Sequence, residues 1–257
     1  MRVELQGGEG PSTRPADRMS KRLSCAICGV RDRALCGALA PEQLPRLNRR
    51  ACQRHYQAGQ FIAAAGQRQD WLATVLSGVV KLTRTMCDGR QQIVGLLFPS
   101  DLLGRPFSDA SPFGAEAATP VELCCLERPY FEELLHQESG MKHRLLERTL
   151  NEVDAAREWM LVLGRKTAEE KVASLILLMA QRLGSRNNGA ATERPVSRFD
   201  LPLSRTEIAE YLGLRIETIS RQLGRLRVAG VIDTEGGRRL AVRDMGKLEQ
   251  LAGKEPV

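Results

Sequence analysis

The sequence lacks the segments that would place a chain in or across a membrane. Its longest apolar run without a charge, Trp71 to Val80, is well short of the roughly 18 residues that a membrane-spanning helix needs. The first ten residues, MRVELQGGEG, contain no apolar stretch of the kind found in a secretion signal. We therefore expect a cytoplasmic protein that has no membrane partner.

Histidine is scarce, and no histidine pair or second cysteine pair completes a zinc-finger motif. His55, His136 and His143 are far apart in the chain. A disulfide scaffold is not expected either, because the seven cysteines are an odd number and a reducing compartment keeps thiols reduced. Clustered cysteines in this chain therefore point first to a metal site or to redox chemistry.

Length and composition indicate a folded chain with more than one domain. Hydrophobic residues make up 42% and charged residues 27% of the 257 residues, as in typical globular proteins. One hydrophobic core rarely serves a chain of this length, so two modest domains are expected. The formal net charge of +7 weakly favours a polyanionic partner.

Composition divides the chain into four segments. Residues 1–24 are interpreted as a flexible tail, and residues 25–138 as a cysteine-rich loop followed by a β-roll. In the second segment short β-type runs alternate with glycines, and Asp88-Gly89 is a hairpin signal, which together favour an antiparallel roll or barrel. Residues 139–165 and 166–257 are assigned to a dimerisation helix and a DNA-binding domain, respectively. The polar stretch 184–200, which contains Gly, Asn, Pro and Ser, is interpreted as a domain boundary or surface loop. The predicted fold class is α+β.

Helical periodicity extends from Phe131 to Leu183, with breaks expected near Gly140 and near Gly164 to Thr167. Inside this stretch residues recur at alternating intervals of three and four, as in a coiled-coil seam. The members of this seam are Leu146, Thr149, Val153, Ala156, Met160 and Leu163. We predict dimerisation through this seam, and the alternative is that the stripe packs against the chain's own barrel.

Residues 204–226, SRTEIAEYLGLRIETISRQLGRL, predict two helices separated by a turn. Ser204 and Glu207 have the spacing of a capping box at the start of a helix. Gly213 lies where the chain must leave the first helix, so a positive φ is expected there. The predicted contact between the helices consists of Ile208, Leu212, Ile219, Leu223 and Leu226. This arrangement is typical of a helix-turn-helix.

The second of these helices carries polar side chains suited to DNA. Glu217, Ser220 and Arg221 lie on one face near its start, where a recognition helix meets base edges. Arg225 follows and is predicted to contact phosphate. Two strands predicted around Glu235-Gly-Gly would complete a winged helix-turn-helix. The alternative is a helical hairpin whose polar face is simply solvated.

Three cysteines near the N-terminus form the pattern C-x2-C-x7-C. Cys25, Cys28 and Cys36 are close enough in sequence to bind one centre, and thiolates favour zinc or iron–sulfur sites. Either site normally has four ligands, so a distant cysteine is needed. The choices are Cys52, Cys87, Cys124 and Cys125. Spacing alone leaves an iron–sulfur cluster, a zinc ion and thiols without a metal as alternatives.

The order of roll, long helix and winged helix-turn-helix resembles the CRP/FNR family of transcription regulators, over residues 25 to about 245. The segment Ile216-Glu-Thr-Ile-Ser-Arg221 is similar to the recognition helix of the FNR branch. The cysteine spacing and the run from Asp88 to Arg105 are similar to FnrL-type regulators in that branch. The resemblance implies a cyclic-nucleotide-binding-like roll and a homodimer that binds palindromic DNA of the TTGAT-ATCAA type through Glu217, Ser220 and Arg221.

The FNR branch also implies a cofactor. Four cysteines in that branch hold an oxygen-labile 4Fe-4S cluster, with the fourth on the last strand of the roll. Correspondence of the apolar positions around that strand favours Cys124 as the fourth ligand beside Cys25, Cys28 and Cys36. Cys125 is the alternative, since adjacent strand residues face opposite ways.

Cys52 and Cys87 match no ligand of the family and are expected to be buried, inert thiols. Cyclic nucleotide is not expected as a ligand, because Phe113-Gly-Ala-Glu-Ala-Ala lacks the arginine that binds its phosphate in relatives. RNA polymerase is an implied partner.

The resemblance therefore predicts a regulator, not an enzyme, that binds DNA under anaerobic conditions and controls the switch between aerobic and anaerobic gene expression. One alternative keeps DNA binding but replaces the cluster by a structural zinc or thiol-redox site. Another is a thiol oxidoreductase that uses Cys25 and Cys28.

Overall fold

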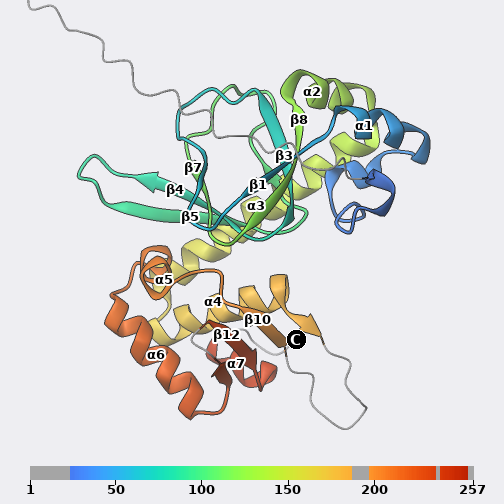
Figure 1. The fold of residues 1–257 in the computed structure, drawn as a ribbon. Helices are drawn as coiled ribbons and strands as arrows, with labels where there is room; N and C mark the ends of the chain where they lie inside the picture. The colour runs from blue at the N-terminus through green and yellow to red at the C-terminus, as the bar shows by residue number, and fades with distance from the viewer. Residues whose placement is uncertain (1–23, 187–196, 236–237, 254–257) are drawn as a thin grey trace, which may run out of the picture.

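A computed structural model describes residues 24–186, 197–235 and 238–253, and it consists of two lobes connected by one long helix (Figure 1). The N-terminal lobe holds the cysteine segment and a β-roll, and the other lobe holds the helix-turn-helix. Apart from Ser24, the predicted N-terminal tail lies outside the described residues. No helix in the described part of the chain combines the length and the apolar character needed to cross a membrane.

The roll consists of two antiparallel four-stranded sheets, with strand orders β1-β8-β3-β6 and β2-β7-β4-β5. Its strands are β1 Cys52–Tyr56, β2 Phe61–Ala63, β3 Trp71–Ser77, β4 Val80–Thr85, β5 Gln91–Leu97, β6 Leu102–Leu103, β7 Gly114–Ala117 and β8 Val121–Glu127. Alternate residues of these strands fill the space between the sheets, among them Val75, Val80 and Leu123. The predicted hairpin turn between β4 and β5 is confirmed, with Gly89 at φ 84°.

Short helical elements precede and follow the roll. Before it come three 3-10 turns, Cys25–Ile27, Leu35–Ala38 and Pro41–Gln43, and helix α1 Leu44–Arg50. After it come α2 Arg128–Gln137, α3 Ser139–Arg165 and α4 Ala168–Leu183. The predicted breaks near Gly140 and near Gly164 to Thr167 are confirmed. Glu138 adopts extended backbone between α2 and α3, so that Gly140 itself lies inside α3, and α3 ends at Arg165 before α4 begins.

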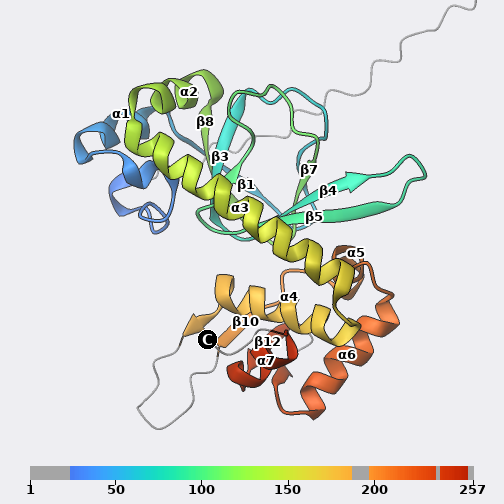
Figure 2. The ribbon, with the colours of Figure 1, turned by 180° about the vertical axis from the view of Figure 1, so that it is seen from behind.

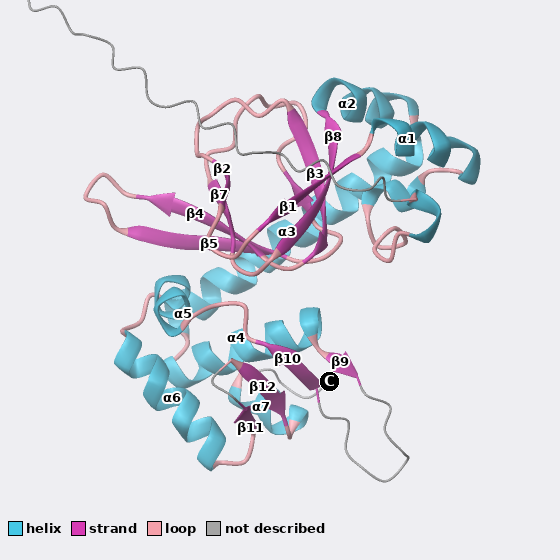
Figure 3. Ribbon diagram, in the orientation of Figure 1, coloured by secondary structure: helices cyan, strands magenta, loops and turns pink. Residues whose placement is uncertain are grey.

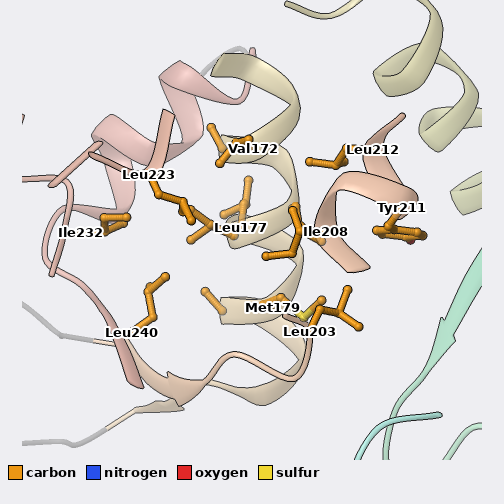
Figure 4. Close-up of a cluster of buried hydrophobic side chains, with 14 of the residues drawn as sticks. Val172, Leu177, Met179, Leu203, Ile208, Tyr211, Leu212, Leu223, Ile232 and Leu240 are labelled. Carbon is orange, nitrogen blue, oxygen red and sulfur yellow. The ribbon is translucent and has the colours of Figure 1, made fainter. Parts of the chain in front are cut away.

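The C-terminal lobe packs a small sheet and three helices around α4 (Figure 3). The helices are α5 Arg205–Leu212, α6 Ile216–Val228 and α7 Met245–Leu251, and the sheet order is β11-β12-β10-β9. The strands are β9 Ser185–Arg186, β10 Ser197–Asp200, β11 Ile232–Glu235 and β12 Arg239–Val242. Figure 4 shows the core, in which side chains of α4, α5, α6 and the sheet meet.

The polar stretch 184–200, predicted as a boundary or surface loop, contains β9 and β10. The loop prediction was wrong at these positions. The sequence of β10 gives little indication of a strand, because Phe199 is its only apolar residue. Pairing with β12 and burial of Phe199 and Ser197 make it a strand. Residues 187–196 of the same stretch lie outside the described residues.

Helix α5 joins the two lobes. Lys81 of β4 donates a hydrogen bond to Glu207 at 2.5 Å, and Gln92 of β5 donates to the Glu210 carbonyl oxygen at 2.5 Å. One turn after Glu207, the Tyr211 ring stacks on Trp159 of α3 with ring centroids 4.8 Å apart. The helix-turn-helix is therefore held by both the roll and the long helix.

Candidate functional site

The cysteine segment, residues 24–39, is a chain of tight turns anchored by a few buried side chains. Successive backbone bonds fold it, such as Arg31 N–H to the Cys28 carbonyl at 3.1 Å and Ala34 N–H to the Val30 carbonyl at 2.9 Å. Its buried anchors are Val30, Ala34, Leu35 and Leu39. Leu35 and Leu39 belong to an apolar cluster with residues of α1, α2, β3 and α3, against which Cys25 and Cys36 also pack. The segment thus depends on the rest of the lobe for its shape.

Strand β8 presents its two adjacent cysteines to opposite faces. Cys125 is buried in the core between the sheets together with Leu123. Cys124 alternates with it and shares its face with Leu126, which belongs to the apolar cluster that the cysteine segment covers. The alternation therefore places Cys124, rather than Cys125, on the side of the N-terminal cysteines.

The four thiols influence one another electrostatically. Burial raises the pKa of the Cys36 thiol to about 11, and the neighbouring Cys28 and Cys25 thiols add to this rise. Burial raises the pKa of Cys124 to about 12, again with contributions from the three N-terminal thiols. The structure therefore brings Cys25, Cys28, Cys36 and Cys124 into one neighbourhood, although about 90 residues separate the last two in sequence.

This donor set fits a centre that carries positive charge. Burial and mutual repulsion both oppose thiolate formation, and Arg31 is the cation that acts in the other direction on Cys25 and Cys36. Within residues 24–186, 197–235 and 238–253, no three His, Cys, Asp or Glu side chains gather as ligands of one metal ion. An iron–sulfur cluster of four irons has a different geometric requirement, because each of its cysteines binds a different iron atom.

The two remaining cysteines differ from expectation. Cys52 and Cys87, predicted to be buried, are both exposed. Cys52 begins β1, the edge strand of its sheet, and Cys87 lies in the turn between β4 and β5, so neither position is covered. Cys52 lies opposite Cys125 in the β1–β8 register, and a hydrogen bond between these two thiols, together with burial, raises the pKa of Cys125.

The helix-turn-helix has the local geometry that its sequence predicts. The Ser204 hydroxyl accepts a bond from the Glu207 N–H, the Glu207 carboxylate accepts one from the Ser204 N–H, and Gly213 ends α5 at φ 62°. The predicted contact residues are all buried, namely Ile208, Leu212, Ile219, Leu223 and Leu226. Helix α6 consequently lies at the edge of the lobe (Figure 1).

The exposed face of α6 carries the side chains predicted to contact DNA. Glu217, Ser220, Arg221 and Arg225 are all exposed, while Ile219 between them is buried. Arg227 is exposed as well, and none of the described residues between Glu217 and Asp233 is acidic. Such a face can offer hydrogen bonds to base edges and positive charge to phosphates.

Helix α3, which runs across the whole molecule in Figure 2, carries an exposed apolar stripe. Of the predicted seam, Leu146 is 57%, Val153 41% and Met160 72% exposed, so these side chains do not pack on the chain's own roll. Ala156 is also exposed, whereas Leu163 is half-buried. The seam prediction missed Leu150, which is 56% exposed and lies four residues after Leu146 and three before Val153. That spacing was available as a signal in the sequence.

Comparisons with known proteins agree with this architecture. Models of two protein families match the chain: the cyclic nucleotide-binding domain over residues 53–138 and the Crp-like helix-turn-helix domain over residues 170–251. The transcriptional activator protein FnrL of Cereibacter sphaeroides is 45% identical over 235 residues, which are 90% of this chain and 92% of that protein. The chain belongs to the CRP/FNR family of transcriptional regulators.

Two further relatives place it among transcriptional activators. A probable transcriptional activator of Rhizobium leguminosarum is 46% identical over 229 residues, covering 89% of this chain and 93% of that protein. The solved structure of FixK2 from Bradyrhizobium japonicum superposes with a TM-score of 0.69 at 30% identity, covering 78% of this chain and 96% of that one. These relatives are DNA-binding regulators rather than enzymes, so the alternative of a thiol oxidoreductase is set aside.

Proposed function

We propose that this protein is an oxygen-responsive activator that binds palindromic DNA as a homodimer while Cys25, Cys28, Cys36 and Cys124 hold a 4Fe-4S cluster. The observation that carries the proposal is the convergence of three turn cysteines with Cys124 on the outer face of β8. The similarity to FnrL adds to it. In this proposal residues 25–138 sense, 139–165 dimerise and 166–257 bind DNA.

The chain's own residues have distinct tasks. When bound, the cluster supplies oxygen-labile bonds that tie the four thiolates together. Leu35 and Leu39 hold the cysteine segment against the lobe. The α3 stripe pairs with a second copy, which sets two recognition helices about 34 Å apart, one DNA turn.

On each half-site of a TTGAT-ATCAA palindrome, Glu217, Ser220 and Arg221 contact base edges and Arg225 contacts phosphate. RNA polymerase is the proposed downstream partner, and the site of action is the cytoplasm, where the DNA is. No cyclic nucleotide is proposed, because Glu116 of the Gly114–Ala117 strand is occupied by Lys81, at 2.8 Å, and that strand has no arginine.

The first experiment measures iron, sulfide and zinc together with the visible spectrum of protein purified without air. We expect about four irons and four sulfides per chain, a brown colour that bleaches in air, and DNA binding that is lost in parallel. One zinc without colour, or no metal, would refute the cluster.

Matched variants sharpen this test. Cys28→Ser and Cys124→Ser should each remove the cluster and anaerobic DNA binding, whereas Cys87→Ser, in an exposed turn, should keep both. Val153→Glu should keep the cluster but give a monomer in sedimentation, because it places a charge in the stripe. A dimeric Val153→Glu protein would show that the stripe is not the interface.

A further inference from the structure

Two arginines of α3 bond directly to the backbone of the cysteine segment. Arg144 donates from Nη1 to the Ala34 carbonyl oxygen at 2.7 Å. Arg148 donates from Nη2 to the Arg33 carbonyl oxygen and from Nη1 to the Ser100 carbonyl oxygen, the latter at 2.7 Å. Both acceptors in the segment lie between Cys28 and Cys36, so these bonds fix the interval that spaces two of the four thiols.

The backbone of the segment approaches α3 closely at this point. A Cβ at Gly37 would be 2.4 Å from Nη1 of Arg144 and 2.4 Å from the Arg31 carbonyl oxygen. A side chain at this position would clash with the Arg31 backbone and would displace the Arg144 guanidinium. The contact between the segment and α3 is therefore a close one at Gly37.

The two arginines lie on the side of α3 opposite its exposed stripe. Each residue advances about 100° around an α-helix, so Leu146 and Leu150 are each rotated by about 200° from Arg144 and Arg148. The helix therefore has one face bonded to the cysteine segment and another that is free to pair with a second copy. A movement of the cysteine segment would therefore act on the turns of α3 that carry Leu146 and Leu150, the first half of the stripe.

Arg148 also connects these elements to the DNA-binding lobe. Its second acceptor, Ser100, precedes Asp101, whose carboxylate lies 3.9 Å from Arg182 of α4. Burial lowers the pKa of Arg148, which shows that its charge is partly shielded from water. Loss of the carbonyl partners would therefore cost more than loss of a surface hydrogen bond.

We propose that Arg144 and Arg148 are positioning residues that couple the cysteine site to dimerisation, by seating α3 only when the segment between Cys28 and Cys36 is ordered. This inference rests on the proposed function. When the segment is ordered, its carbonyl oxygens accept hydrogen bonds from both guanidinium groups and hold α3 in one position. When the segment is released, the guanidinium groups bind water instead and the helix can shift. Coupling of this kind is measured as a ratio of dimerisation constants with and without the cluster.

The test compares Arg144→Met/Arg148→Met with wild type and with Arg68→Met as a control. Methionine keeps an apolar stem but no donor, and Arg68 is an exposed arginine of the roll whose partner is Asp70. For each protein we would measure iron and sulfide content, and the dimer dissociation constant by sedimentation in the anaerobic and the air-treated forms. The single variants, measured in the same way, replace the double variant if it does not fold.

We expect the double variant to bind the cluster but to lose about tenfold or more of the ratio between the two dimer constants, because both charge-assisted hydrogen bonds to the cysteine segment are removed. Arg68→Met should keep the wild-type ratio. A purely structural role would weaken both dimer constants equally and leave the ratio unchanged, which would overturn the inference. A wild-type ratio of one, or wild type without iron, would instead overturn the proposed function and the inference with it.

Discussion

The cysteine segment and the helix-turn-helix lobe place their functional side chains in opposite ways. The thiols of Cys36 and Cys124 are shielded from water and pack among residues of the N-terminal lobe. The side chains of Glu217 and Arg221 are instead exposed on the surface of α6. The helix-turn-helix lobe is built on a large continuous apolar core, which also takes in Val79, Ile93 and Phe98 of the roll. The cysteine segment has only a few buried anchors, which pack on the roll, α1, α2 and α3. A site on the surface of a stable core tolerates change, whereas a site that is part of the packing does not.

The largest expected effect breaks the core of the DNA-binding lobe. Leu212→Ala removes a fully buried side chain that lies beside α4 in Figure 4 and should lower the unfolding free energy by about 2–5 kcal/mol. DNA binding should be lost with it, while iron content per folded roll is kept. Denaturant unfolding followed by circular dichroism, with iron analysis, would measure both. Loss of the cluster in this variant would show that the cysteine site depends on the stability of the DNA-binding lobe.

Removal of the cation between the lobes should have the next largest effect. Lys81 lies 2.8 Å from Glu116 and 2.5 Å from Glu207, and its side chain is 9% exposed, so Lys81→Met leaves two shielded carboxylates without their partner. We expect a loss of about 3 kcal/mol in unfolding free energy. The double variant Lys81→Met/Glu207→Gln removes one stranded charge and should recover part of the loss. Equal stability of the single and double variants would refute this explanation.

Arg221→Ala should act on DNA binding alone. The side chain is exposed and makes no contact that supports the core, so unfolding free energy should change by less than about 0.5 kcal/mol. Loss of a base contact should weaken specific binding by about 1–3 kcal/mol and relax the preference at one base pair. Fluorescence anisotropy with matched and altered palindromes would measure this, with Arg225→Ala as the comparison. Arg225→Ala should weaken binding to all sequences and reduce its salt dependence.

Acid should weaken the contact between the lobes. Burial alone raises the pKa of Glu207, but hydrogen bonds from Lys81 and Ser204 outweigh it and lower the pKa below its ordinary value of 4.5. The stabilisation is therefore complete above about pH 4.5 and is lost as the pH falls through the lowered pKa. The stability gap between wild type and Glu207→Gln should close over that range, with Glu133→Gln of α2 as an exposed control. A gap that stays constant down to pH 3 would contradict the assignment.

The smallest expected effect comes from Cys87→Ser. Cys87 is exposed in a turn, so stability should change by less than about 0.5 kcal/mol, with cluster content and DNA affinity unchanged. Any loss of iron in this variant would mean that the fourth ligand has been assigned to the wrong cysteine.

Local signals predicted the helix-turn-helix well because its determinants are close in sequence. Ser204 and Glu207 cap one helix, Gly213 ends it, and helical spacing sorts buried Ile219 from exposed Ser220. The same kind of reasoning failed for β10. A strand of four residues with one apolar side chain carries almost no local signal, and its partner β12 is about 40 residues away in sequence.

Burial of single cysteines could not be predicted, because it depends on strand order. Cys52 is exposed because β1 is an edge strand, whereas Cys125, directly opposite it, is buried because β8 lies between β1 and β3. Nothing in the flanking residues distinguishes an edge strand from a central one.

The sequence by itself determined which chemistry is present: thiols in a C-x2-C-x7-C pattern, a recognition helix, and an apolar stripe with coiled-coil spacing. These follow from residue type and from short-range periodicity. The tertiary structure alone decided which face of β8 Cys124 occupies relative to the other thiols, that Lys81 reaches Glu207, and that Arg144 and Arg148 bond to the cysteine segment. Each of these contacts joins residues about 90 or more positions apart, and only the packing of the whole chain brings such residues together.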